Sequence, residues 1–193
     1  SKVKKYLIFN VNFNKMSNAV RILPHYTFED YKRWEGKWEI ISGLAFDMSP
    51  TPAPKHQKIA SQLDKLLGNA IDASSCKCVI YQPLDLKISE DTILNPDLLI
   101  VCKPIEKMYL DFPPDLVVEI LSPSTRLKDL HSKFDIYENF GIKYYVIVDP
   151  DDESIKVYCL SESGKYEEFK NYPYIFSFQD ACEISVELNK IWE

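Results

Sequence analysis

Residues 116–121 read Leu116-Val117-Val118-Glu119-Ile120-Leu121, a nearly continuous apolar run with one carboxylate inside it. Two similar runs are Leu98-Leu99-Ile100-Val101-Cys102, directly after Asp97, and Tyr144-Tyr145-Val146-Ile147-Val148. Short apolar runs of this kind are typical of strands that are buried on both faces of a sheet. They predict three strands at the centre of one sheet.

The segments around these strands predict helices and further strands. Ser124 or Thr125 can cap a helix that runs to about Phe140 and ends at Gly141, which gives the order strand, strand, helix, strand. Together the elements predict an α/β fold with a mixed β-sheet flanked by helices. The other predicted elements are a short helix from Thr27 toward Gly36, a hairpin over 38–48, a helix over 54–71, a strand over 79–88, and antiparallel strands over 155–160 and 166–169.

Composition indicates one globular domain. The chain has 193 residues, 46% of them hydrophobic and only 5 of them glycine. We expect a single domain over residues 21–193, preceded by an N-terminal extension over 1–20, of which residues 1–15 precede a possible start at Met16. No apolar stretch approaches the ~20 residues of a membrane helix, so we expect no membrane partner.

The five cysteines are odd in number and lie mostly in predicted strands. Cysteine in such places behaves as a small core residue, which favours a reducing cytoplasm. The pair Cys76 and Cys78 lacks a second pair or a histidine at zinc-finger spacing, so the sequence does not favour zinc.

The net charge is −6, which weakly disfavours binding of a polyanion such as DNA across the whole protein surface. The charge is uneven: residues 1–58 carry 10 basic and 5 acidic side chains, whereas 149–193 carry 4 and 11. A nucleic-acid surface built from the N-terminal part therefore stays possible.

Two carboxylates stand out because burial of an unpaired charge is costly. Asp97 precedes one apolar strand and Glu119 lies within another. Converging carboxylates on rigid strands suit Mg²⁺, although an isolated Glu is more often held by an ion pair or reaches water at an edge. On a helical wheel with Leu127 as the reference position, the apolar residues form one arc and Lys133 falls inside it. It either snorkels to solvent or points at the two carboxylates.

These residues also carry a family resemblance. The runs Asn95-Pro96-Asp97 and Pro114 to Thr125, followed by Lys133, Tyr137, Tyr144-Tyr145 and Asp149-Pro150, resemble the Uma-type restriction endonucleases common in cyanobacteria. That family belongs to the PD-(D/E)xK nuclease superfamily. The resemblance covers about residues 24–170.

The resemblance implies a restriction endonuclease-like core and a metal site. Asp97 matches the metal-binding Asp, Glu119 matches the acidic residue of the second half-motif, and the carbonyl of Ile120 would be a further ligand. Leu121 stands where the superfamily has its lysine, so the catalytic cation is not given by the motif. Lys133, which matches a helical lysine of the family, is our candidate for a migrated equivalent.

Three further residues are candidates for the site. Glu39 matches a family Glu and would be an additional metal or water ligand, unless it is a surface residue at a strand edge. His56 points toward the packed side of its helix and is more often a hydrogen-bonded border residue than a base. Arg126 and the N-terminal lysines would contact flanking phosphates. The acidic cluster 149–153 is expected to be a solvated turn.

We therefore expect an endonuclease that hydrolyses DNA with Mg²⁺, or Mn²⁺ in its place, with Lys133 orienting the water or neutralising the phosphate. A homodimer is plausible by analogy with nucleases that cut two strands. The alternative is a catalytically inactive nuclease-fold interaction module, which Leu121 and the acidic balance favour. A hydrolase of small phosphate esters is a weaker third possibility.

Overall fold

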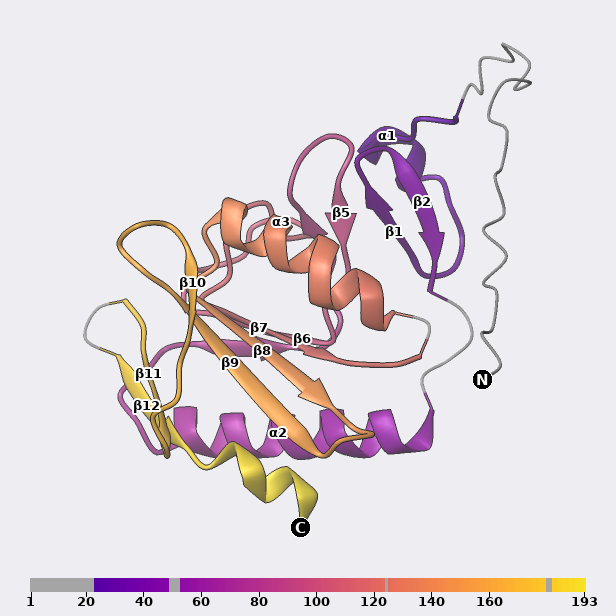
Figure 1. Cartoon of the computed structure of the whole chain (residues 1–193). Coiled ribbons are helices and arrows are strands. Elements are labelled where there is room, and N and C mark those ends of the chain that lie inside the picture. Colours follow the sequence, from indigo (N-terminus) through magenta and orange to yellow (C-terminus); the bar gives the residue numbers. More distant parts are fainter. Residues whose placement is uncertain (1–22, 49–52, 124, 180–181) are drawn as a thin grey trace, which may run out of the picture.

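The computed structural model describes residues 23–48, 53–123, 125–179 and 182–193. The expected extension over 1–20, and the possible helix cap Ser124, lie outside these residues. Figure 1 shows a central sheet between two helices, with a smaller N-terminal unit above it and the C-terminal segment below.

The central sheet has six strands in the order β10-β9-β8-β7-β6-β3. Strands β7 and β8 are parallel, and the other pairs are antiparallel, so the predicted mixed sheet is confirmed. The parallel pair is joined by the predicted helix, as a parallel connection requires. The strands are β3 (Val79–Tyr81), β6 (Leu98–Val101), β7 (Leu116–Ile120), β8 (Tyr144–Asp149), β9 (Ser154–Leu160) and β10 (Tyr166–Glu168).

One helix covers each face of this sheet (Figure 1). Helix α2 (Pro54–Asp72) begins at a proline and packs its buried residues on one face with alternate residues of the strands, such as Leu98 and Val118. Helix α3 (Lys133–Phe140) packs on the other face with Leu99 and Val117. Because all residues of β6, β7 and β8 are buried, these strands form the predicted double-sided core.

The helix that leads into α3 contains a π-helical turn over Lys128–Ser132. The wheel of a regular α-helix placed Leu127 on the apolar face, and this is wrong: Leu127 is 76% exposed, whereas Asp129 and Lys133 are buried. The wider π turn changes the angle between the residues before it and those of α3. A helical wheel with 100° per residue therefore cannot place both on the correct face.

The N-terminal unit contains α1 (Phe28–Tyr31), capped by Thr27 and Asp30, and the predicted hairpin of β1 (Trp38–Ile41) and β2 (Leu44–Asp47). The hairpin belongs to a second sheet of order β2-β1-β5-β4, with β4 (Leu86–Lys87) and β5 (Ile93–Leu94). The single strand predicted over 79–88 is therefore wrong. It divides near Pro83, which cannot donate to a strand ladder, and the two halves join different sheets.

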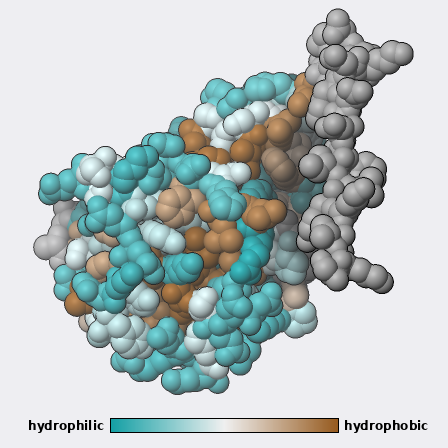
Figure 2. Space-filling model, viewed as in Figure 1, coloured by the Kyte–Doolittle hydropathy of each residue, from teal (hydrophilic) through white to brown (hydrophobic). Residues whose placement is uncertain are grey.

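The C-terminal segment adds a hairpin of β11 (Tyr174–Ser177) and β12 (Glu183–Val186), followed by a 3-10 helix over Leu188–Trp192. It packs on α2, where Phe176 and Ile191 join the core. In the view of Figure 1, the space-filling surface shows hydrophobic residues as a band through a largely hydrophilic face (Figure 2). None of the helices in the described residues combines the length and apolar character that crossing a bilayer requires.

The expectation of unpaired cysteines is wrong for four of the five. Disulfides join Cys76 to Cys182 and Cys78 to Cys102, and Cys159 is free. The partners are 106 and 24 residues apart, and sequence alone does not give the pairing of such distant cysteines.

Candidate active site

Asp97 and Glu119 lie opposite each other at the ends of two paired strands. Strand β6 pairs with β7 in a register that sets Leu98 against Val118, so the next positions along the two strands are Asp97 and Glu119. Directly opposed residues of antiparallel strands have their Cβ atoms about 5 Å apart on one face of the sheet. The two carboxylates that the sequence singled out are therefore brought together.

Asp97 is fixed by hydrogen bonds to a backbone amide and to a helix side chain. The amide of Ile120 donates to Asp97 Oδ2 over 2.8 Å, and His56 Nε2 lies 3.2 Å from the same oxygen. The side chain of Asp97 remains 22% exposed, and among the described residues its Oδ1 has no hydrogen-bond partner. This carboxylate therefore has a free oxygen that solvent can reach.

His56 is held next to Asp97 by helix α2. Burial alone would lower the pKa of His56, but the hydrogen bond and charge of Asp97 outweigh it, and the backbone of Ile120 adds to this effect. The pKa of His56 is therefore raised, which favours the imidazolium form. His56 thus already interacts with two of the three residues predicted to bind a metal.

Glu119 is buried and binds two side chains of helix α3. Lys133 Nζ donates to Glu119 Oε1 over 2.8 Å, and the Tyr137 hydroxyl donates to the same oxygen over 2.6 Å. Lys133 is therefore within hydrogen-bond reach of this carboxylate, as a migrated lysine would have to be. The snorkelling alternative is excluded, because the Lys133 side chain is 1% exposed.

Lys133 also contacts two more carboxylates. Its Nζ lies 2.9 Å from Glu39 Oε1 and 3.1 Å from Asp129 Oδ1. Glu39 is fully buried, so it is not a surface residue at a strand edge, and it accepts a hydrogen bond from the Asn95 amide over 3.0 Å. The ammonium group is thus enclosed by three carboxylates and has no exposed surface for a phosphate.

Sequence reasoning missed Asp129 and Lys128. Asp129 precedes Lys133 by four residues, a spacing that favours an ion pair on a helix and could have signalled it. Lys128 forms an ion pair with Glu39. Nothing in the local sequence indicates this contact, because the two residues are 89 positions apart.

The charges of the cluster set the protonation of its members. Burial would lower the pKa of Lys133, but its three carboxylate partners outweigh it and raise that pKa well above its usual value. Burial would raise the pKa of Glu39, yet Lys133 and Lys128 lower it overall. Burial raises the pKa of Glu119 well above its usual value, since the other carboxylates offset much of the benefit of Lys133. A further cation beside Glu119 would therefore favour its ionised form.

Arg126 does not join this cluster. Its guanidinium lies 2.6 Å from Asp149 and 3.7 Å from Asp152. Residues 150–153 form the expected turn between β8 and β9, whereas Asp149 is the last residue of β8 and is buried. Arg126 therefore anchors this turn in the present structure. Leu121, at the position of the missing motif lysine, is a buried core residue.

The residues present fit a hard divalent cation. Four carboxylates, Asp97, Glu119, Glu39 and Asp129, face two lysines and one histidine. Mg²⁺ commonly takes one or two protein carboxylates and keeps several waters, so Asp97 and Glu119 suffice as protein ligands. The charge of Asp97 also raises the pKa of His56, as a carboxylate that favours a cation beside it would do.

Comparisons with known proteins agree on one family and one fold. Residues 28–187 match the Uma2 family, which is described as "Putative restriction endonuclease". The chain is 30% identical over 153 residues to the uncharacterized protein slr1290 of Synechocystis sp., covering 74% of this chain and 78% of that protein.

A crystal structure of a putative nuclease of the DUF820 group from Anabaena variabilis superposes with a TM-score of 0.66 at 18% identity. The match covers 86% of this chain and 99% of that one. The predicted restriction endonuclease-like fold is confirmed. By the extent of these matches, the chain belongs to the Uma2 family of restriction endonuclease-like proteins.

Proposed function

We propose that the chain is a Mg²⁺-dependent endonuclease that hydrolyses phosphodiester bonds in DNA. The observation that carries the proposal is the pairing of Asp97 and Glu119 across β6 and β7, at the positions that the family resemblance assigns to metal ligands. Family membership and fold support a nuclease. The choice of metal and of substrate rests on the chemistry of the site.

Asp97, Glu119 and the carbonyl of Ile120 would hold Mg²⁺ or Mn²⁺. When bound, the ion would polarise a phosphate and lower the pKa of an attacking water. His56 contacts Asp97, and Lys133 donates a hydrogen bond to Glu119. Each of the two carboxylates therefore has a basic side chain beside it. Because Lys133 is enclosed by carboxylates, its role is to position Glu119 rather than to contact the phosphate.

Glu39 connects the two segments that carry Asp97 and Lys133. Glu39 fixes Lys133 and also accepts the amide of Asn95, two residues before Asp97. The chain that carries Asp97 and the helix that carries Lys133 are therefore linked through one buried carboxylate. Such preorganisation keeps two ligands at a constant separation while a substrate binds.

The proposal is tested by nicking of supercoiled plasmid at low salt with Mg²⁺ or Mn²⁺. We expect metal-dependent nicking by the wild type and by Asp111→Asn, which alters an exposed carboxylate paired with Lys107. Asp97→Asn should reduce the rate by at least about 100-fold, since it removes a ligand of the metal. Nicking should also fall steeply with salt if phosphate contacts hold the DNA.

A non-catalytic interaction module is the second candidate, and the enclosed Lys133 together with Leu121 favours it. In that case no metal would support nicking, and Asp97→Asn would bind DNA as the wild type does. Nicking that persists equally in Asp97→Asn would show that the activity does not come from this site. Hydrolysis of a small diester without any nicking would favour a phosphoesterase.

A further inference from the structure

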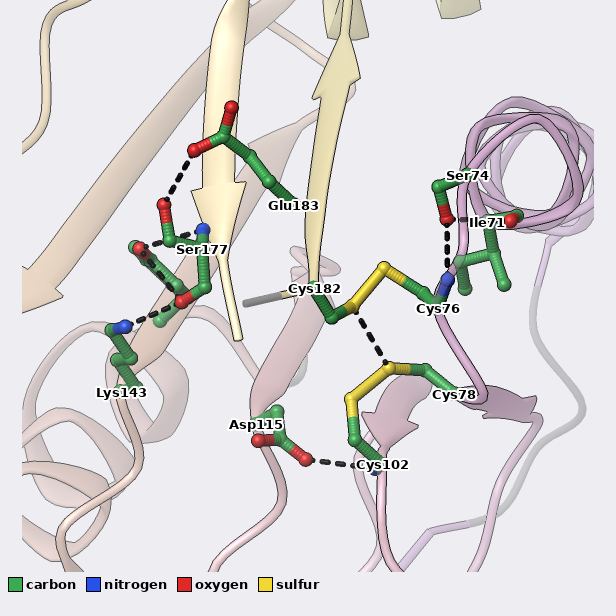
Figure 3. Close-up of a disulfide and its surroundings, with 11 residues drawn as sticks. Ile71, Ser74, Cys76, Cys78, Cys102, Asp115, Lys143, Ser177, Cys182 and Glu183 are labelled. Carbon is green, nitrogen blue, oxygen red and sulfur yellow. Dashed lines mark hydrogen bonds between the residues drawn. A yellow bond between two sulfur atoms is a disulfide. The ribbon is translucent and has the colours of Figure 1, made fainter. Parts of the chain in front are cut away.

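Four cysteines gather in one cluster beside the C-terminal end of α2, apart from the carboxylate site. Cys76 and Cys78 follow α2, Cys102 follows β6, and Cys182 precedes β12. The disulfides Cys76–Cys182 and Cys78–Cys102 lie side by side, and Figure 3 shows them in contact. Three distant parts of the chain therefore contribute sulfur atoms to one small volume.

The sulfur positions have the dimensions of a metal–thiolate centre. Cys78 Sγ lies 3.6 Å from Cys182 Sγ although the two are not bonded, and the sulfurs of Cys76, Cys78 and Cys182 all lie within 4.8 Å of one another. In a tetrahedral site with Zn–S bonds of about 2.3 Å, the sulfurs stand roughly 3.8 Å apart. The fourth sulfur, Cys102 Sγ, is bonded to Cys78 but lies outside this group of three, so a four-thiolate site requires the Cys102 side chain to turn toward the other sulfurs after reduction.

The backbone around the cluster is held by contacts that do not depend on the disulfides. The amide of Cys76 donates to Ser74 Oγ over 3.0 Å, and this hydroxyl donates to the carbonyl of Ile71 over 2.7 Å. The amide of Cys102 donates to Asp115 Oδ2 over 2.8 Å (Figure 3). Cys78 and Cys182 are buried in the core around α2. The four side chains should therefore stay together after reduction.

We propose that the reduced cluster binds one Zn²⁺ ion through the four thiolates. Two molecules of a dithiol reductant supply four electrons and four protons, which convert two disulfides into four thiols, and the dithiols become disulfides. Binding of Zn²⁺ then releases the four thiol protons to solvent. Soft thiolate ligands select zinc over magnesium, so this site and the carboxylate site differ in metal preference.

The consequence of the site is a link that survives a change of redox state. In the oxidised protein, one disulfide ties the loop after α2 to the C-terminal segment, and the other ties the same loop to the end of β6. A zinc ion would hold the same three segments when the disulfides are reduced. The site is structural, because all four positions are taken by protein ligands.

The test is metal binding by the full chain after reduction with a dithiol and removal of the reductant without oxygen. We expect one tightly held zinc per chain by elemental analysis. Co²⁺ in its place should give the intense sulfur-to-metal charge-transfer and tetrahedral d–d bands of an S₄ site. Zinc should also protect the four cysteines from alkylation, while Cys159 in the same sample is modified.

Three variants locate the ion. Cys159→Ser should bind as the wild type does, because Cys159 lies outside the cluster. Cys102→Ser should lose the share of the charge-transfer intensity that one of the four thiolates contributes and weaken zinc binding by at least about tenfold. Asp97→Asn should retain the zinc. Absence of charge-transfer bands in the reduced wild type, or loss of zinc in Asp97→Asn but not in Cys102→Ser, would overturn the proposal. Neither result depends on nuclease activity.

Discussion

At the scale of single residues, Lys133 is the centre of the candidate site. It is a buried cation with three carboxylate neighbours, and it fixes Glu119 directly. A buried charge cluster of this kind stabilises a fold only while its members remain paired. The contribution of Lys133 to stability can therefore be separated from its contribution to activity.

Lys133→Met should destabilise the protein by about 3 kcal/mol, because it leaves buried carboxylates without their shared partner. Urea unfolding at neutral pH measures this change. The matched control is Lys107→Met, which breaks an exposed ion pair with Asp111 and should leave the urea midpoint nearly unchanged. Adding Glu119→Gln to Lys133→Met should recover part of the loss. Equal effects of the two lysine variants would contradict the buried cluster.

If Asp97 binds a metal as proposed, His56 should make that binding depend on pH. Its pKa is raised by Asp97, so the imidazolium–carboxylate pair is complete below the ordinary histidine pKa of about 6.5 and is lost as pH rises through the raised value. A metal on Asp97 competes with this pair. We expect the Mg²⁺ concentration for half-maximal nicking to fall as pH rises through that range.

The matching variant is His56→Gln, which keeps a polar side chain but does not titrate. Its metal requirement should change much less between pH 6 and pH 8 than that of the wild type. An unchanged pH dependence in this variant would show that His56 does not compete for Asp97.

At the scale of elements, the sequence predicted those whose pattern is local. The apolar runs at β6, β7 and β8 and the proline-started helix α2 were predicted within about two residues. The π turn and the division of residues 79–88 between two sheets were not, since both depend on tertiary contacts. Asp97 and Glu119 were identifiable for the same reason, because each lies next to or within a local apolar run. The contact of Glu39 with Lys133 of α3 was not predictable, because it joins distant segments of the chain.

Because of the π turn, we expect the fold to tolerate polar substitution of Leu127. A regular helix would bury this side chain, but the structure exposes it. Leu127→Ser should therefore change the free energy of unfolding by no more than about 0.5 kcal/mol. Leu63→Ala, a fully buried position of α2, should cost about 2–5 kcal/mol in the same assay. A large loss in Leu127→Ser would contradict the exposed position.

At the scale of the whole molecule, the Cys76–Cys182 disulfide spans 106 residues and ties the C-terminal segment to α2. A cross-link over a loop of this length stabilises a protein by up to about 4 kcal/mol, chiefly by restricting the unfolded chain. Reduction in the presence of a chelator should lower the urea midpoint accordingly. An unchanged midpoint would show that the segment is held by packing alone.

The proposed activity requires one divalent cation bound by Asp97 and Glu119, between β6 and β7. The most direct test is calorimetric titration of Mn²⁺ into the oxidised protein, in which the four disulfide-bonded cysteines are not available as ligands. We predict one binding site in the wild type and in Asp111→Asn, and at least about tenfold weaker binding in both Asp97→Asn and Glu119→Gln. Binding of Mn²⁺ to Asp97→Asn with the affinity of the wild type would contradict the account.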